Sequence, residues 1–119
     1  MVDRELTRSP GSAGIARELV NARTAMLGSQ RREHAALLVS ELVNNALMHG
    51  IGAIWLRIDV ESDGVRVEVS DQGNVAVPPN PTPGAHGGWG LRIVDQLADE
   101  WGVLDGSTRV WFRVTQPSQ

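Results

Sequence analysis

Two runs of alternating apolar and polar residues, joined by a short turn, constrain the fold of this chain more than any other feature. The run over residues 53–60 places four apolar side chains on one face: Ile54, Leu56, Ile58 and Val60. The run over residues 65–70 does the same with Val65, Val67 and Val69. Ser62-Asp63-Gly64 between them is typical of a hairpin turn. The pattern predicts two antiparallel strands, with one face of their sheet buried and the other in solvent.

The sequence before this hairpin predicts a polar segment followed by a first helix. Residues 1–11 are polar and contain Pro10-Gly11, so we interpret them as a flexible N-terminal arm. A helix over about residues 13–27 follows, with Ser12 as its expected N-cap and an irregular apolar stripe. Gly28 is expected to end this helix.

A second, longer helix is predicted up to about His49. Ser29 or Gln30 is its expected cap, and Glu33 in the first turn can complete a capping box. Gly50 is expected to stop this helix, immediately before the hairpin.

The chain after the hairpin opens with a segment that the sequence excludes from regular structure. Residues 72–90 hold four prolines and five glycines, a composition typical of a binding loop or a lid. A short helix over residues 91–99 and two strands, over 101–104 and 108–115, are then predicted.

Composition excludes several function classes. All eleven cationic residues are arginine, so Schiff-base catalysis and the lysine-bearing phosphate loop are excluded. The absence of cysteine excludes a thiol nucleophile, a disulfide scaffold and a zinc–thiolate site. The three histidines, His34, His49 and His86, are too scattered to predict a metal cluster. We expect a single domain over residues 12–115 with a tail at 116–119.

Charge and hydropathy bear on the expected partners and location. A net charge of −3 argues against direct nucleic-acid binding, which normally needs a basic surface. No segment has the apolar length of a membrane span or the pattern of a signal peptide, so we expect a cytoplasmic protein without membrane contact.

Two polar residues interrupt the apolar stripe of the long helix. Glu41 and Asn45 are four residues apart and therefore lie on one helix face. A carboxylate beside an amide oxygen can supply part of the ligands of a magnesium ion, or the two groups can hold a water molecule in position. The alternative is a strip of the helix that simply faces solvent.

Two further polar residues follow the inward phase of their strands. Asp71 continues the phase of Val65, Val67 and Val69, so its carboxylate is expected on the core side of the sheet. A buried carboxylate needs donors, which the exocyclic amine of an adenine could supply. The alternative is that Asp71 merely opens a turn. Thr108 has the phase of the last strand's apolar residues, and it either borders a pocket or is an ordinary strand threonine.

The glycine-rich segment Gly87-Gly88-Trp89-Gly90-Leu91 directly precedes the predicted short helix. Exposed backbone N–H groups next to a helix N-terminus form a favourable place for phosphate. The alternative is a flexible glycine-rich turn.

Taken together, four segments resemble the sequence boxes of the GHKL ATPase superfamily, and within it the anti-sigma-factor serine/threonine kinases. Residues 40–50 (SELVNNALMHG) resemble the asparagine box, and residues 67–73 (VEVSDQG) the first glycine box. Residues 87–102 resemble the second glycine box, and residues 106–112 the closing strand.

This resemblance implies an α+β fold of the Bergerat type: a two-layer α/β sandwich with helices on one face of a mixed sheet. It also implies bound ATP and Mg²⁺, with a lid over about residues 74–86. By position, Glu41 would be the catalytic residue that orients or deprotonates the attacking hydroxyl, and Asn45 would be the magnesium ligand. The implied nucleotide-binding residues are Asn45, Asp71, Gly73, Gly88, Gly90, Leu91 and Thr108.

The function that the resemblance implies is an ATP-dependent regulator. The leading hypothesis is a Mg²⁺-dependent serine/threonine kinase that phosphorylates a small antagonist protein and, in its other state, sequesters a sigma factor. One alternative is a regulatory module that binds ATP and a protein partner without transferring phosphate. Another is a structural domain that binds no nucleotide. The family resemblance also allows a homodimer.

Overall fold

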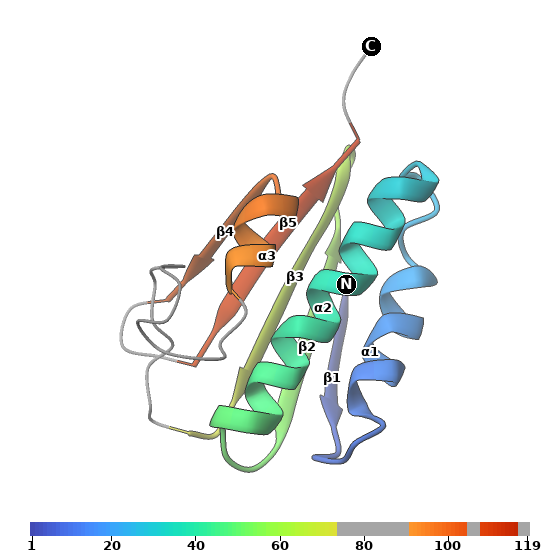
Figure 1. Ribbon diagram of the computed structural model, residues 1–119. Helices are drawn as coiled ribbons and strands as arrows, with labels where there is room; N and C mark the ends of the chain where they lie inside the picture. Colours follow the sequence, from blue (N-terminus) through green and yellow to red (C-terminus); the bar gives the residue numbers. More distant parts are fainter. Residues whose placement is uncertain (74–90, 105–107, 117–119) are drawn as a thin grey trace.

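A five-stranded sheet with helices on one face organises the chain (Figure 1). The computed structural model describes residues 1–73, 91–104 and 108–116. In chain order the elements are β1 (Val2–Leu6), α1 (Ser12–Asn21), α2 (Ser29–His49), β2 (Ile54–Val60), β3 (Gly64–Asp71), α3 (Leu91–Leu97), β4 (Glu100–Val103) and β5 (Val110–Thr115). The α+β class and the two-layer arrangement predicted from the sequence are thereby confirmed.

The strand order is β1-β2-β3-β5-β4, and every neighbouring pair is antiparallel. The expectation of a mixed sheet is therefore wrong for the described residues. The hairpin of β2 and β3 has the predicted register, with Val60 opposite Val65 and Leu56 opposite Val69. Alternation fixes this register because a one-residue slip would turn the apolar side chains into solvent.

The N-terminal segment departs most from the sequence-based expectation. Residues 2–6 are not a loose arm but an edge strand that pairs with β2, from Val2 opposite Ile58 to Leu6 opposite Ile54. Asp3, Arg4 and Glu5 between them are exposed, which gave the segment a polar character. A short, charged strand is typical of a sheet edge that must not pair with other chains.

Both expected helix caps are also wrong. α1 begins at Ser12 itself, whose hydroxyl donates to the carbonyl of Thr7 instead of capping the helix. α1 ends at Asn21, six residues before the expected end at Leu27. The N-cap of α2 is Gly28, with no side-chain cap from Ser29, Gln30 or Glu33.

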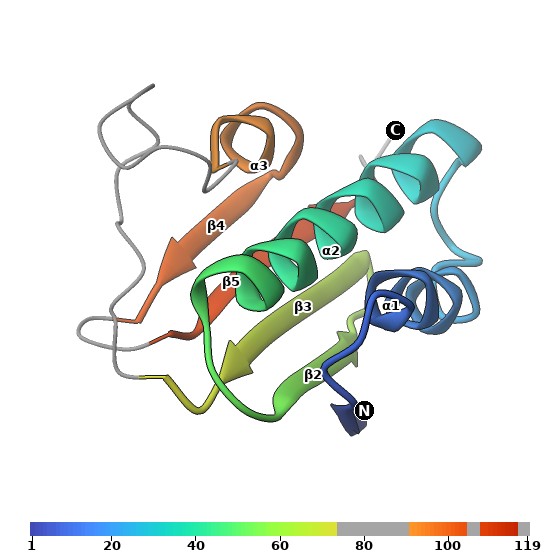
Figure 2. The same ribbon diagram turned by 60° about the horizontal axis from the view of Figure 1, so that its bottom comes forward.

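The core lies between the sheet and the helices. α2 lies over β3 and β5, and α1 lies beside it over β1 and β2 (Figure 2). Leu38, Val39 and Val43 of α2 are fully buried, as are Phe112 and Ile58 of the sheet. Each such side chain stabilises the fold by about 1.5–3 kcal/mol relative to an exposed position. The buried side chains form one connected cluster that fixes α2 against the sheet.

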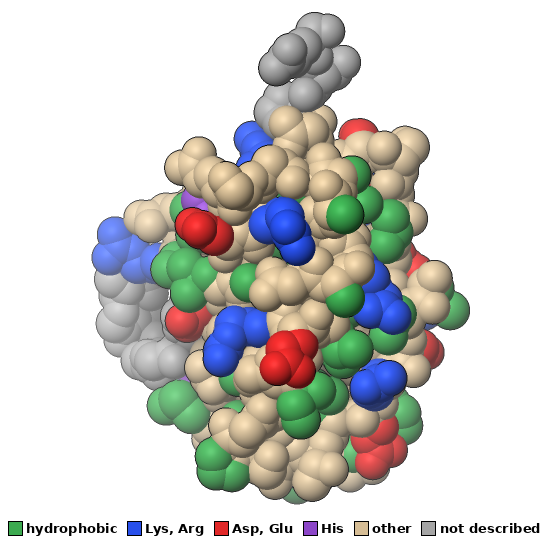
Figure 3. Space-filling model, turned by 90° about the vertical axis from the view of Figure 1, so that its right-hand side faces the viewer, with side chains coloured by type: hydrophobic (Ala, Val, Ile, Leu, Met, Phe, Trp, Pro, Cys, Tyr) green, Lys and Arg blue, Asp and Glu red, His purple; other side chains and the backbone are tan. Residues whose placement is uncertain are grey.

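The opposite face of the sheet carries charged side chains. Arg113 of β5 donates to Glu61 and to Glu100, both at 2.8 Å. The hydrogen bond and charge of Glu61 raise the pKa of Arg113 above its ordinary value. Figure 3 shows the side of the molecule at which α1 lies, where hydrophobic, basic and acidic side chains are interspersed. None of the helices in the described residues is long and apolar enough to span a membrane.

Candidate functional site

A narrow cavity lies between the C-terminal half of α2 and the sheet, where β3 ends and β5 begins. Its volume is about 10 Å³, about the space that one water molecule needs. The lining residues are Leu42, Asn45, Ala46, Val69, Asp71, Thr108 and Val110. Three of the residues predicted from broken apolar patterns, Asn45, Asp71 and Thr108, thus meet at one place. They come from α2, from the end of β3 and from the segment just before β5, and the packing of α2 on the sheet brings them together.

Asn45 projects from the buried face of α2. It is 6% exposed, and its Nδ2 atom has no hydrogen-bond partner among the described residues. An unpaired buried polar group costs about 1–3 kcal/mol. The two ends of an amide are interchangeable by rotation of the side chain, so Asn45 can present either an oxygen or an N–H group to the cavity. A polar ligand in the cavity would remove this cost.

Asp71 ends β3 at the wall of the same cavity. Its Oδ1 accepts the backbone N–H of Gly73 at 2.6 Å, which is the geometry of a turn closed by an aspartate side chain. The two sequence-based interpretations of Asp71 are therefore compatible. The residue opens a turn and also borders the cavity, where its carboxylate remains an acceptor.

Two glycines surround the Asp71 carboxylate. A Cβ atom at Gly73 would lie 2.9 Å from Oδ1 of Asp71. A Cβ atom at Gly50 would collide with the carboxylate from the other side and would lie 2.7 Å from the carbonyl oxygen of Ala46. The sequence indicated Gly50 only as a helix stop. Its contact with Asp71 arises from the fold, and no local sequence signal predicts it.

Thr108 stabilises the end of β3. Its hydroxyl accepts the N–H of Asp71 and donates to the carbonyl of Asp71, both at 3.1 Å. The side chain thereby takes the place of a backbone ladder partner just beyond the Val69–Val110 pair. Thr108 is 9% exposed and borders the cavity, so it both shapes the wall and holds Asp71 in place.

Glu41 lies one helical turn before Asn45 and outside the cavity lining. It is half-buried, and within the described ranges its carboxylate has no hydrogen-bond or ion-pair partner. Leu91, another predicted site residue, is 3% exposed and is the first residue of α3. Gly88, Gly90 and the expected lid over residues 74–86 lie outside the described residues.

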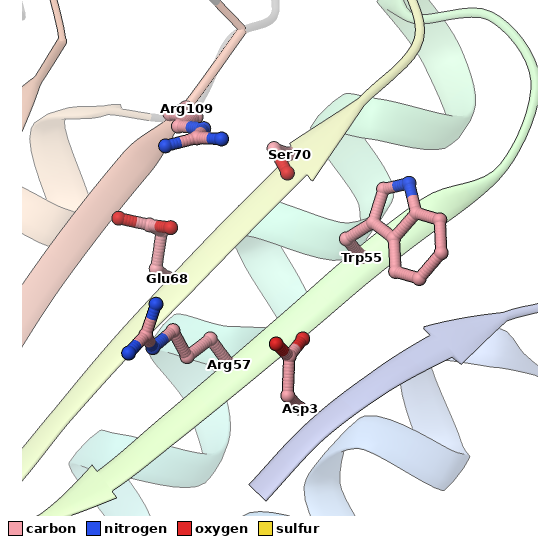
Figure 4. A pocket seen from close by; sticks show the side chains of 6 residues that line it. All are labelled: Asp3, Trp55, Arg57, Glu68, Ser70 and Arg109. Carbon is pink, nitrogen blue, oxygen red and sulfur yellow. The ribbon is translucent and has the colours of Figure 1, made fainter. Parts of the chain in front are cut away.

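A second hollow lies on the other face of the sheet, away from the helices (Figure 4). It is larger, with a volume of about 440 Å³, and it is more open to solvent than the cavity at Asn45. The side chains around it are mainly charged and come from β1, β2, β3 and the residue before β5: Asp3, Trp55, Arg57, Glu68, Ser70 and Arg109. None of the predicted site residues that the structure describes borders it. The smaller cavity is the better candidate because buried polar groups converge there.

The donor groups at the cavity limit how a metal ion could be held. Among residues 1–73, 91–104 and 108–116, no three histidine, cysteine, aspartate or glutamate side chains are grouped as metal ligands. A cation at Asn45 would therefore take most of its oxygen ligands from a bound anion and from water. This requirement fits a metal that arrives with a phosphate-bearing ligand.

Comparison with known proteins agrees with the geometry. A family model described as a histidine kinase-like ATPase domain matches residues 7–114. No curated protein matches the chain. The matched range includes every residue that lines the cavity, as well as Glu41, Gly50 and Gly73.

Proposed function

The chain belongs to the family of histidine kinase-like ATPase domains and is an ATP-binding domain of the GHKL type, and from this premise we propose that it is an anti-sigma-factor-like regulator. In this proposal it transfers phosphate from Mg·ATP to a serine or threonine of a small antagonist protein, and its other partner is a sigma factor. The observation that carries the proposal is the buried amide of Asn45, whose nitrogen has no partner among the described residues, in the same cavity as the Asp71 carboxylate.

The adenine end of ATP would lie at Asp71. A carboxylate is an acceptor, so it suits the exocyclic amine of adenine and not the carbonyl of guanine at the same ring position. Gly50 and Gly73 leave room around the carboxylate, and Thr108 fixes the backbone that carries it. Apolar contact with the base would come from Leu42, Val69 and Val110.

The triphosphate end would lie toward Asn45 and the start of α3. Asn45 would ligate Mg²⁺ through its amide oxygen, and the ion would neutralise charge on the phosphates when bound. Leu91, at the N-terminus of α3, would direct its backbone N–H to the phosphates, together with Gly88 and Gly90. Because the chain has no lysine, Arg92, which is exposed beside Leu91, is a candidate to balance the γ-phosphate.

Glu41 would serve as the catalytic base. Its carboxylate is unpaired in the described part of the chain and lies one turn from Asn45. In the proposed reaction Glu41 takes the proton of the acceptor hydroxyl as that oxygen attacks the γ-phosphorus. The bond between phosphorus and the β–γ bridging oxygen breaks, and ADP leaves.

Phosphate transfer can be tested directly with radiolabelled ATP. The protein is incubated with [γ-³²P]ATP, Mg²⁺ and candidate antagonist proteins, and labelled products are separated by electrophoresis. We expect a labelled antagonist with the wild type and none with Glu41→Ala, although calorimetry still shows ATP binding. Glu33→Ala is the matched control, since Glu33 is an exposed glutamate on the same helix, two turns away.

The runner-up function is a module that uses ATP as a conformational ligand only. It predicts Mg·ATP binding without transfer to any partner, and equal behaviour of the wild type and Glu41→Ala. Co-purification of the native protein would supply the partners for this assay. A structural domain without nucleotide, the third hypothesis, predicts no Mg·ATP binding in calorimetry.

A further inference from the structure

Arg8, just after β1, reaches the C-terminal end of α2. Its Nη1 donates to the carbonyls of Ala46 and Leu47, at 2.8 and 3.1 Å. Its Nε donates to the carbonyl of Gly52, at 2.9 Å. The planar guanidinium thus holds the helix end and the following loop at the same time, which a single-point donor cannot do.

The helix end and the loop that Arg8 holds both contact the proposed nucleotide site. Ala46 lines the cavity and follows Asn45 directly. The loop that contains Gly52 lies against the end of β3: the N–H of Gln72 donates to the carbonyl of Ile51 at 2.9 Å. At the start of this loop, Gly50 packs against the carboxylate of Asp71.

The electrostatics favour Arg8 at this place. A cation near the last carbonyls of a helix interacts favourably with the helix dipole. The carbonyl of Ala46 also accepts the N–H of Gly50 at 2.9 Å, so Arg8 is its second donor. However, Nη2 of Arg8 is buried and has no hydrogen-bond partner among the described residues. The desolvation of this atom offsets part of the gain, so the net effect of Arg8 on stability is smaller than its three hydrogen bonds suggest.

We propose that Arg8 is a positioning residue for adenine selectivity: it fixes the end of α2 and the loop at residues 50–53, and thereby the carboxylate of Asp71. The inference rests on the proposed role of Asp71 in binding the adenine amine. Without Arg8 the loop and Gly50 can shift, and Asp71 then no longer meets the amine at the right angle. ATP loses that hydrogen bond, whereas a nucleotide without the amine has none to lose.

The test compares ATP with inosine 5′-triphosphate, which carries a carbonyl in place of the amine. Dissociation constants with Mg²⁺ are measured by calorimetry for the wild type and for Arg8→Ala. We expect Arg8→Ala to weaken ATP binding by about tenfold and inosine triphosphate binding by about twofold or less. The preference for ATP therefore falls about fivefold, a change in ratio that a reduced fraction of folded protein cannot produce.

Arg31→Ala is the matched control, because Arg31 holds the opposite end of α2 through Asp99 and the carbonyl of Thr115. It should lower stability and leave the ATP preference unchanged. Arg8→Lys keeps the positive charge but not the planar guanidinium with its several donors, so it should give an intermediate preference for ATP. If Arg8→Ala does not fold, Arg8→Lys provides the test.

The outcomes separate this inference from the proposed function. An unchanged ATP preference in a folded Arg8 variant would overturn the positioning role while leaving Asp71 as the adenine acceptor. Equal binding of the two nucleotides by the wild type would instead overturn the role of Asp71, and the inference with it.

Discussion

The two ends of helix α2 both carry polar and charged side chains, but these side chains have protein partners at one end and face a cavity at the other. At the N-terminal end, Arg31 donates to Asp99 at 2.9 Å and to the carbonyl of Thr115 at 2.6 Å, and Asp99 accepts the N–H of Thr115 at 2.7 Å. At the C-terminal end, Asp71 has no ion-pair partner within the described residues, and the amide of Asn45 is buried with an unpaired nitrogen. Charges at the first end therefore bind one another, whereas polar groups at the second end face a cavity.

Under the proposed function, this difference separates residues that stabilise the fold from residues that bind the nucleotide along a single helix. Paired groups such as Arg31 and Asp99 connect α2 to β5 and to the residue before β4, and their effect is structural. Unpaired groups around a cavity cost free energy until a ligand supplies their partners. One buried nitrogen near the N-terminal end, Nε of Arg32, also lacks a partner among the described residues, but its guanidinium still donates to the carbonyl of Asn21 at 2.9 Å. Matched substitutions at the two ends test this difference.

The largest contrast is expected from changing one aspartate at each end to asparagine. Asp71→Asn replaces an acceptor with a group that can present N–H to the adenine amine, so ATP binding should weaken by about a hundredfold, from the loss of a charge-assisted hydrogen bond of about 1.5–3 kcal/mol. Asp99→Asn should leave ATP binding unchanged and lower the melting temperature. Calorimetry with ATP and thermal unfolding measure the two effects. Equal ATP affinity of both variants would contradict a difference between the two ends of α2 in ATP binding.

The second contrast uses one glycine at each end. A Cβ atom at Gly50 collides with Asp71, so Gly50→Ala should displace the carboxylate and weaken ATP binding by about tenfold. A Cβ atom at Gly28, the N-cap of α2, would lie 3.7 Å from Oε1 of Gln116, an ordinary contact, so Gly28→Ala should bind ATP like the wild type. ATP affinity is again measured by calorimetry, with circular dichroism to confirm the fold. Normal affinity in Gly50→Ala would show that the carboxylate does not need its observed position.

The third contrast uses one threonine from each end of the β5 region. Thr108→Val removes a hydroxyl that bonds both backbone groups of Asp71, so the end of β3 should loosen and ATP affinity should fall about threefold. Thr115→Val, at the last residue of β5, should leave the affinity unchanged, because Thr115 binds Asp99 through its backbone N–H. Fluorescence titration with a labelled ATP analogue can resolve a threefold effect. A larger effect of Thr115→Val than of Thr108→Val would contradict the assignment of the two ends.

The sequence predicted the fold best where one face of an element is buried. Period-two alternation located β2 and β3 to within about one residue, and the long helix α2 was predicted from Ser29 or Gln30 to His49. β1 was missed, because only Val2 and Leu6 of its five residues point to the core and its exposed charges are typical of an arm. The direction of strand pairing also depends on how the connections run in space, which local periodicity does not encode.

For the site, the structure brings together three residues that the sequence singled out because a polar side chain breaks an apolar pattern. Asn45, Asp71 and Thr108 each occupy a position where packing favours an apolar side chain, and they line one cavity. Gly50 and Arg8 carry no such signal. Each acts through a residue that is distant in the sequence, so only the fold reveals its contacts. The roles of all the predicted site residues toward ATP and Mg²⁺ stay predictions: Glu41, Asn45, Asp71, Gly73, Gly88, Gly90, Leu91 and Thr108.

The smallest expected effect is the coupling between Arg31 and Asp99, and it tests the structural end by itself. Their side chains are about one third exposed, so water and salt screen the pair and its coupling free energy should be about 0.5–1 kcal/mol. A double-mutant cycle with Arg31→Ala, Asp99→Ala and the double variant, followed by urea unfolding, measures this value. All three variants should bind ATP with wild-type affinity, because none of the groups they remove borders the cavity. If the cycle showed coupling in ATP affinity as well as in stability, the two ends of α2 would act as one unit, and the separation of stability from binding would not hold.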